Sequence, residues 1–404
     1  MQHLLARKKS SSSMRGKQSK FGVSTPTPTT PTTPSDQKPR EEKSIPYTDP
    51  RYESLLKTKG VFLSEHKQGI TAGSNIQYRR LLEADNDTPK DSLFDDDLFK
   101  ATCKELQNRN EAKIIQDISR LIVPSAQHLT IRGSQSLEIL IETVNEGWNN
   151  SIPLTRPRPQ PDYAVGFRRE AFTEEQLNKM QPLVGELTDT SYFVATWYMY
   201  FPFLTCEVKG GATSLDNADR QNAHSMTLAM RGPVELFRAV GREKELNREI
   251  LAFSIAHDDT TVRIYGHYPV IEGPKTTFYR HPIHKYDFTA LEGRDKWTAY
   301  KFTKNIYDLW MPDHLKRLCS VIDQLPADLS FEVSQQSELE FQETGLFQGF
   351  QSYALEQSNP DSASFLARDS QASVLQGHYV TPETSVSQSS GPFKKPKKRP
   401  AETR

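Results

Sequence analysis

The stretch FPFLTCEVKGG, residues 201–211, joins an apolar strand pattern to two opposite charges and a pair of glycines. Side chains alternate between the two faces of a strand, so Glu207 and Lys209 share one face while Cys206 and Val208 share the other. An unpaired charge costs several kcal/mol when it is buried, so these two charges must be paired, solvated or bound to a metal. The end of this strand therefore predicts either a salt bridge at the rim of a sheet or a chemical site.

The composition of the chain predicts one folded core between two long tails. Only 35% of the 404 residues are hydrophobic and the mean hydropathy is -0.66, yet the apolar residues are concentrated between Leu98 and Leu329. The formal net charge is +0, so the overall charge indicates no particular class of partner. Three separated cysteines in no C-x-x-C spacing indicate a reducing compartment, without a disulfide framework or a zinc knuckle.

The sequence carries no secretory or membrane signal. The N-terminal residues have only a two-leucine apolar patch before a basic cluster, and no run of about 18 apolar residues occurs anywhere. We therefore expect a soluble intracellular protein that is not secreted and has no membrane partner.

Shifts in composition divide the chain into four parts. Residues 1–50 are rich in Ser, Thr and Pro and are expected to be disordered, because they cannot bury enough apolar area to offset the entropy of ordering. Residues 51–100 are an approach segment whose acidic run, DSLFDDDLF, is expected to be a solvated loop. Residues 101–330 are predicted to form an α/β domain. Residues 331–404 are predicted to be a disordered Ser/Gln-rich tail with a basic end.

Hydrophobic periodicity places helices and strands along the predicted domain. Helices are predicted over residues 110–123, 136–148, 214–240 and 294–325. The third of these is expected to be divided at Pro233, and Thr173 with Gln176 predicts a capping box at the start of a further helix. Strands are predicted over residues 162–167, over residues 192–209, and over two segments of residues 250–271 that a turn at Asp258-Asp259 joins.

The order of these elements around two short motifs resembles the core of the PD-(D/E)XK nuclease superfamily. Pro161-Asp162 opens one strand, Glu207-Val208-Lys209 ends the next, and a helix and another strand follow. Other Pro-Asp pairs and E-x-K tripeptides occur, but only this pair has both the order and the strand context. The resemblance implies an α/β fold with a restriction-endonuclease-like core, in which helices flank a small mixed sheet.

The resemblance also implies a metal site at the ends of these strands. Hydrolysis of a phosphodiester needs a divalent cation to polarise the phosphoryl oxygen, and Mg²⁺ or Mn²⁺ takes oxygen ligands. Asp162 and Glu207 would supply carboxylates and Val208 its main-chain carbonyl. Lys209 would orient or deprotonate the attacking water, or stabilise the phosphorane. The residues alone leave open the alternative of a rim ion pair beside an aspartate in a turn.

Further positions are candidates for the same site. Gln221 lies twelve residues after Lys209, where many members of the superfamily carry a glutamine on the next helix. Some members use a glutamate of the first helix as an additional metal ligand, for which Glu111 is the first candidate and Glu142 the second. His224 lies on the same predicted helix as Gln221, and its role stays open.

The other histidines of the predicted domain are expected to have no catalytic role. His281 and His284 have the His-x-x-His spacing of a zinc site, but the sequence offers no third ligand nearby. We therefore expect both of them, and His267, to be hydrogen-bonded histidines of strands or loops.

Longer stretches of the chain resemble an uncharacterised fungal family, a domain of unknown function. They include RPQPDYAVGFRREAFTEEQL, DRQNAHSMTLAMRG and KWTAYKFTKNIYDLWMP. This second resemblance implies a domain from Asn110 to Leu329 and implies no activity.

The sequence therefore predicts a metal-dependent nuclease-like protein that hydrolyses phosphodiester bonds in DNA or RNA. The alternative is a catalytically inactive module of the same fold that binds nucleic acid or protein. The basic hexamer KKPKKR is expected to direct the chain to the nucleus, and without it the expected compartment is the cytoplasm. Importin would bind the basic residues of this hexamer: Lys394, Lys395, Lys397, Lys398 and Arg399.

Overall fold

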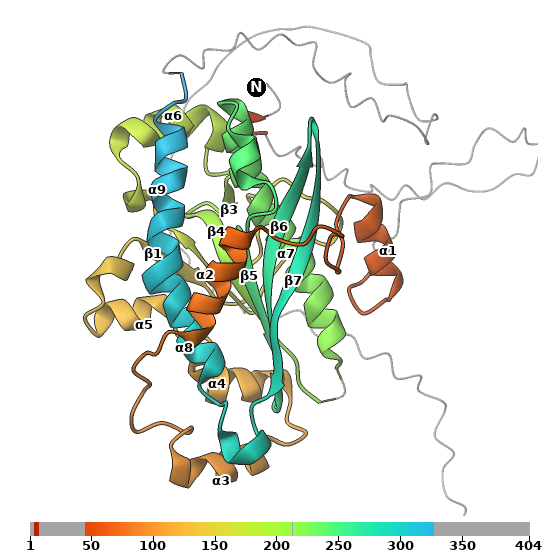
Figure 1. The fold of residues 1–404 in the computed structure, drawn as a ribbon, viewed down its shortest axis with the longest axis vertical. Helices are drawn as coiled ribbons and strands as arrows, with labels where there is room; N and C mark the ends of the chain where they lie inside the picture. Colours follow the sequence, from red (N-terminus) through yellow and green to blue (C-terminus); the bar gives the residue numbers. More distant parts are fainter. Residues whose placement is uncertain (1–3, 8–44, 212, 327–404) are drawn as a thin grey trace, which may run out of the picture. The chain divides into compact units, whose positions relative to one another are not determined.

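The computed structural model describes residues 4–7, 45–211 and 213–326 (Figure 1). Most of the two predicted tails, including the basic hexamer that starts at Lys394, lies outside these residues. Within the first predicted tail, the main-chain N–H of Arg7 donates to the carbonyl of Thr190 at 2.8 Å. That part of the tail is therefore paired with the domain.

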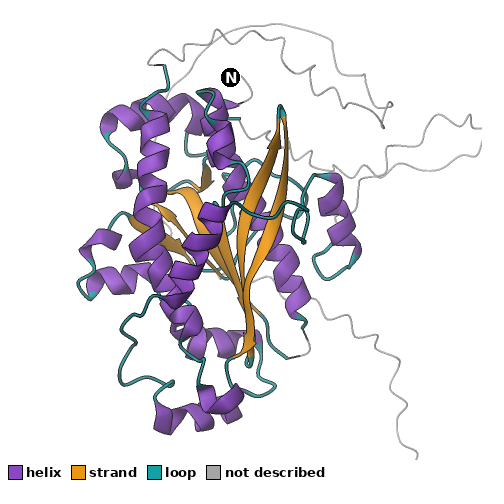
Figure 2. Ribbon diagram, viewed as in Figure 1, coloured by secondary structure: helices purple, strands orange, loops and turns teal. Residues whose placement is uncertain are grey.

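β4 (Met199–Val208) lies inside a seven-stranded mixed sheet (Figure 2). All ten of its residues are buried, which fits its aromatic-rich sequence. The strand order is β1-β2-β4-β5-β6-β7, β3 pairs with β4 off this path, and among the described strands only β4 and β5 pair in parallel. The other strands are β1 (Leu140–Thr143), β2 (Tyr163–Phe167), β3 (Val194–Thr196), β5 (Ala252–His257), β6 (Thr261–Glu272) and β7 (Lys275–Asp287).

Helices cover both faces of the sheet. α7 (Leu215–Ala239) connects β4 to β5 and packs on one face, where the Thr205 hydroxyl donates to Asn222 Oδ1 at 2.7 Å. α4 (Glu111–Ile122) packs on the other face, where Ser119 Oγ lies 3.1 Å from His257 Nε2. The remaining helices are α1 (Arg51–Thr58), α2 (Ala72–Glu83), α3 (Asp96–Leu106), α5 (Ala126–Ile131), α6 (Glu174–Val184), α8 (Thr298–Asn305) and α9 (Met311–Ile322).

The α/β architecture predicted from the sequence is confirmed, with helices flanking a mixed sheet. The helix predicted over residues 110–123 is α4, and α6 begins with the capping box formed by Thr173 and Gln176. No helix within the described ranges combines the length and the apolar character needed to cross a membrane.

Two local predictions are wrong because tertiary contacts decide the structure there. Residues 136–148 were expected to be helical, but β1 forms within them and pairs with β2, so Leu140 lies opposite Phe167. α7 was expected to be divided at Pro233, but it continues as one helix to Ala239. Pro233 and the residues beside it are buried, and we infer that this packing offsets the hydrogen bond that proline cannot donate.

The approach segment, residues 51–100, contains α1, α2 and the start of α3 and is packed against the domain. Tyr52 and Leu56 of α1 are fully buried, and Val61 forms a bridge with Phe278 of β7. The acidic run, expected to be a solvated loop, leads into α3 and buries two aromatic side chains, Phe94 and Phe99. The folded unit therefore begins well before the predicted domain boundary.

Candidate functional site

The register of β2 and β4 brings the two motifs together. Tyr163 pairs with Cys206 in antiparallel register, so Asp162, the residue before β2, lies next to Glu207 on the same face of the sheet. The Asp162 carboxylate is fixed in place, because its Oδ2 accepts a hydrogen bond from the Val208 main-chain N–H at 2.7 Å.

Lys209 lies at the centre of the site, which we call the Lys209 cluster and define as Glu111, Asp162, Glu207 and Lys209. The ammonium nitrogen is 3.5 Å from Glu111 Oε2, 3.5 Å from Glu207 Oε2 and 3.8 Å from Asp162 Oδ2. Glu207 is 1% exposed and Lys209 is 5% exposed. The Glu111 side chain is 41% exposed, so the cluster is buried on the β4 side and open on the α4 side.

The glycine pair after β4 lets α4 approach the site. A Cβ on Gly210 would lie 2.4 Å from the Glu111 nitrogen and 2.9 Å from the Arg109 carbonyl oxygen, both of which are backbone atoms. Gly211 has a φ of +62° and donates its N–H to the Arg109 carbonyl at 3.0 Å. Asn110 caps α4 through the Lys113 N–H, so Glu111 stands in the first turn of the helix and reaches Lys209.

Gly210→Ala is expected to destabilise the protein by about 3 kcal/mol, because the new methyl group must displace the backbone at the start of α4. The matched control is Gly211→Ala, whose Cβ meets open space. The control is expected to cost only about 1 kcal/mol, from the left-handed backbone conformation. Urea unfolding of both variants measures the difference. Equal losses would contradict the close approach of α4 to Gly210.

Burial and mutual charge set the protonation states of the cluster. Burial raises the pKa of Glu207 well above its usual value, and the charge of Asp162 raises it further. Burial alone would lower the pKa of Lys209, but the charges of Glu207, Asp162 and Glu111 outweigh burial and raise it. Lys209 is therefore an ammonium here, suited to donating hydrogen bonds and stabilising negative charge.

A cation at this site would have to keep part of its water shell. In the part of the chain that the structure describes, no three His, Cys, Asp or Glu side chains converge as a ready-made metal cage. The carboxylates instead surround the Lys209 ammonium. Mg²⁺ commonly binds through one or two carboxylates and completes its shell with water and phosphate, so Asp162, Glu207 and the Val208 carbonyl are the groups that would hold such an ion.

Among the described residues, two other candidates for the predicted site, Gln221 and Glu142, do not contact the Lys209 cluster. Gln221 is half-buried on α7, and no hydrogen bond within the described ranges joins its side chain to the Lys209 cluster. Its neighbour Asn222 is the residue that reaches the sheet, through Thr205 of β4 and the Ile255 carbonyl. Glu142 lies away from the cluster on β1, where it accepts a hydrogen bond from the Tyr163 hydroxyl at 2.8 Å.

The histidines are held by hydrogen bonds or ring contacts. His267 is buried and its Nε2 lies 2.7 Å from Ser254 Oγ. His281 pairs with Glu65 at 2.5 Å, and His284 stacks on a tyrosine ring. His224, whose role the sequence left open, is fully buried and bonds Tyr47 Oη at 2.9 Å. Tyr47 belongs to residues 1–50, which were expected to be disordered; its contacts with α7 show that this end of the predicted tail is packed on the domain instead.

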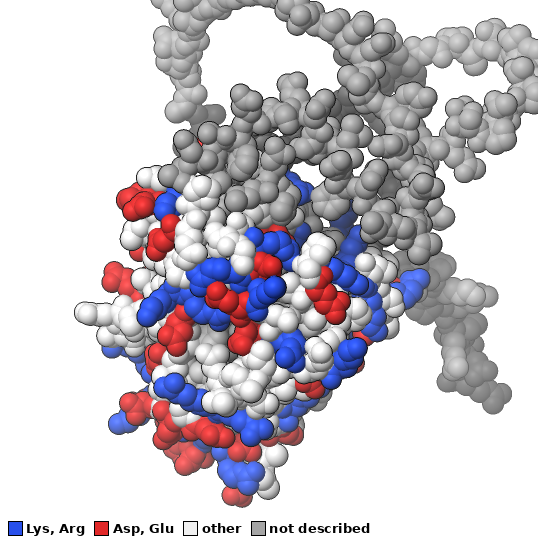
Figure 3. All heavy atoms as spheres, turned by 45° about the horizontal axis from the view of Figure 1, so that its top comes forward, with Lys and Arg blue, Asp and Glu red and all other residues white. Residues whose placement is uncertain are grey.

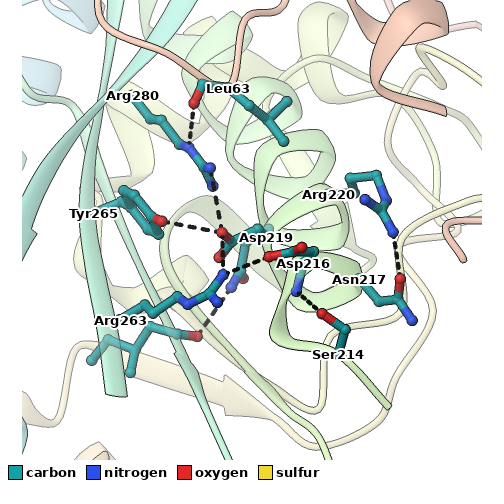
Figure 4. Close-up of polar contacts among 11 residues, drawn as sticks. Leu63, Ser214, Asp216, Asn217, Asp219, Arg220, Arg263, Tyr265 and Arg280 are labelled. Carbon is teal, nitrogen blue, oxygen red and sulfur yellow. Dashed lines mark hydrogen bonds and ion pairs between the residues drawn. The ribbon is translucent and has the colours of Figure 1, made fainter. Parts of the chain in front are cut away.

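A second ion cluster joins Asp219 of α7 to residues of β6 and β7, on the face of the sheet that also carries Glu207 (Figure 4). Asp219 of α7 accepts hydrogen bonds from Arg263 at 2.9 Å and from the Tyr265 hydroxyl at 3.1 Å, and it pairs with Arg280 at 3.3 Å. These contacts tie α7 to β6 and β7 and fix the helix that follows the glycine pair.

On the face seen in Figure 3, basic and acidic side chains are interspersed, so that view has no broad surface of one charge.

Comparison with known proteins identifies a family. A model described as Domain of unknown function (DUF7924) matches residues 98–322, which is more than half of the chain. The match spans β1 to β7 and contains all four residues of the Lys209 cluster. No curated protein matches the chain.

Proposed function

The chain belongs to the DUF7924 family, and from the Lys209 cluster we propose that it is a metal-dependent nuclease that hydrolyses phosphodiester bonds in DNA or RNA. The observation that carries this proposal is the convergence of Asp162, Glu207 and Lys209 at the ends of neighbouring strands, with Lys209 within 3.8 Å of both carboxylates. We place the domain with the PD-(D/E)XK nucleases as part of the same proposal.

Each residue of the cluster has a role in this chemistry. A bound Mg²⁺ or Mn²⁺ would polarise the phosphoryl oxygen and offset the charge that develops on it. Asp162 and Glu207 would hold the cation, with the Val208 carbonyl as a further oxygen ligand. The Lys209 ammonium orients the attacking water and stabilises the negative charge of the phosphorane. Glu111 lies on the open side and holds the ammonium in position.

A nuclear location completes the proposal and rests on the sequence alone. Importin would recognise the basic hexamer from Lys394 to Arg399, which lies outside the described residues. A nuclear compartment supplies both classes of nucleic acid as substrate.

The purified chain is expected to bind Mn²⁺ and Mg²⁺ and to cleave mixed DNA and RNA substrates only when one of these metals is present. Isothermal titration calorimetry measures metal binding and gel electrophoresis measures cleavage. Asp162→Asn is expected to weaken both, because it removes a charged ligand that the Val208 N–H holds in place. A wild-type chain that neither binds metal nor cuts any substrate would favour the alternative, an inactive module that binds nucleic acid or protein.

A further inference from the structure

Trp197 is an exposed aromatic side chain in the turn between β3 and β4. It is 59% exposed, and every other Phe, Tyr and Trp of the described residues is buried or half-buried. Its ring meets that of Tyr198 edge to face, with the centroids 4.8 Å apart. The Tyr198 hydroxyl donates a hydrogen bond to Glu146 Oε2. The exposed ring is therefore held in place by an anchored neighbour.

The segment that anchors Trp197 also contacts a residue of the candidate metal site. Glu146 follows Asn145, whose main-chain N–H donates to the Asp162 carbonyl at 3.2 Å. The Asn145 side chain is fixed as well, because its Oδ1 accepts a hydrogen bond from Gln160 Nε2 at 2.9 Å. A chain of direct contacts therefore joins the exposed ring to the strand end that carries Asp162.

Arg158 adds positive charge to this side of the site. Its Nη1 donates to three main-chain carbonyls of residues 148–151, the closest being that of Ser151 at 2.8 Å. Within the same residues, the N–H of Asn150 donates to the Ala195 carbonyl of β3 at 3.1 Å. No carboxylate pairs with Arg158 in the part of the chain that the structure describes. Carbonyls therefore position the guanidinium, which keeps its charge and its other N–H donors for an anion.

The other side of the site carries negative charge. β5 pairs with β4 on the side away from β2, and the turn that follows β5 contains Asp258 and Asp259. β7 ends there with Asp287, and the exposed Lys285 only partly balances these carboxylates. They would repel the phosphates of a nucleic acid, so a substrate is expected to extend from the site over the β1 side.

We propose that Trp197 and Arg158 bind an unpaired nucleic-acid strand next to the scissile phosphate, with a base stacked on Trp197 and a phosphate on Arg158. This inference rests on the proposed nuclease function and adds the class of substrate, which is single-stranded. A base within a duplex is already stacked on its neighbours, whereas an unpaired base is free to stack on an exposed aromatic ring. The free N–H donors of a guanidinium suit the oxygens of a phosphate.

The test uses variants of the exposed ring, which lies outside the core. Trp197→Leu keeps apolar bulk and removes the aromatic face, whereas Trp197→Phe keeps a smaller aromatic face. The matched control is Ile76→Ala, which removes a side chain of α2 that is 71% exposed. Fluorescence anisotropy measures binding of a labelled oligonucleotide, as a single strand or as a blunt duplex, with Ca²⁺ in place of Mg²⁺ to separate binding from cleavage. Thermal melting checks that every variant is folded.

The wild type is expected to bind the single strand more tightly than the duplex. Trp197→Leu is expected to weaken single-strand binding about tenfold, as loss of one stacked base does, while Trp197→Phe keeps most of the affinity. Ile76→Ala is expected to bind like the wild type, and all four proteins to bind Mn²⁺ equally. The single strand is also expected to quench tryptophan emission in the wild type and much less in Trp197→Phe.

Arg158 is tested by the dependence of binding on salt. Arg158→Gln loses a charge but keeps an amide that can donate to the loop carbonyls. It is expected to lower the slope of log affinity against log salt concentration by about 0.7 for the single strand, the effect of one lost phosphate contact. An unchanged slope removes Arg158 from the proposed surface.

Three results overturn the role of Trp197 and leave the nuclease proposal standing. They are a wild type that prefers the duplex, single-strand binding that Trp197→Leu leaves unchanged, and an equal loss in Ile76→Ala. A wild-type protein that binds neither Mn²⁺ nor nucleic acid overturns the nuclease proposal, and the single-strand surface with it.

Discussion

Glu207→Gln is expected to lower the proposed metal-dependent cleavage at least about a hundredfold while leaving the fold intact, because Glu207 is a metal ligand in the proposed mechanism and such a ligand stabilises the transition state by several kcal/mol. Glu207 is 1% exposed, and burial raises its pKa well above the usual value, so the carboxylate is held at a position that disfavours its charge. The amide has the same shape and no charge, and its oxygen can still accept from Lys209.

Stability is the second measurement on this variant. Lys209 keeps its contacts with Asp162 and Glu111 when Glu207 is neutral, so the free energy of unfolding is expected to change by less than about 1 kcal/mol. Urea unfolding measures that change, and calorimetry with Mn²⁺ measures the loss of metal affinity. A variant that retains full cleavage would remove Glu207 from the metal site. One that loses several kcal/mol would make Glu207 a structural partner of Lys209.

The arrangement of charges at the end of β4 can be predicted from local sequence, because every second side chain of a strand points to the same face. Glu207 and Lys209 must share a face, and Asp162 joins them as soon as β2 pairs with β4. Glu111 is adjacent through a contact between residues far apart in the sequence, since the side-chain-free Gly210 admits the start of α4. Short-range patterns therefore predict only that Glu207 and Lys209 share a face, and the resemblance to a nuclease superfamily supplied Asp162 and Glu111.

The residues that sequence reasoning missed are positioned by contacts across long separations. Tyr47 meets His224 at a sequence separation of 177 residues, and a tyrosine at the end of a tail that composition predicts to be disordered carries no signal of that contact. The sequence analysis chose Gln221 and not Asn222, because many members of the nuclease superfamily carry a glutamine on this helix. The orientation of α7 about its own axis instead turns Asn222 towards Thr205. β1 was missed because its leucine and isoleucine spacing fits a helix and a strand equally well.

Lys209→Met is expected to destabilise the metal-free protein by about 3–5 kcal/mol, the cost of removing one partner of a buried ion pair. The ammonium lies within 3.8 Å of three carboxylates, so its loss leaves their charges facing one another. Mn²⁺ or Mg²⁺ is expected to restore much of this stability. A cation that binds only the folded state raises the free energy of unfolding of the protein, and the effect grows with the concentration of the cation. Cleavage is expected to stay absent, since the metal does not replace the group that orients water.

The matched control for this variant is Lys296→Met. Lys296 is also nearly buried and pairs with a carboxylate, that of Asp96, but the Asp96 side chain is fully exposed and no second carboxylate pairs with Lys296 within the described ranges. Its loss is expected to lower stability with no response to metal, as urea unfolding with Mn²⁺ or with EDTA will reveal. If metal fails to stabilise Lys209→Met more than Lys296→Met, the carboxylates around Lys209 serve to balance its charge. The inactive binding module then becomes the better account, because three carboxylates with no affinity for a cation cannot support phosphodiester hydrolysis by this route.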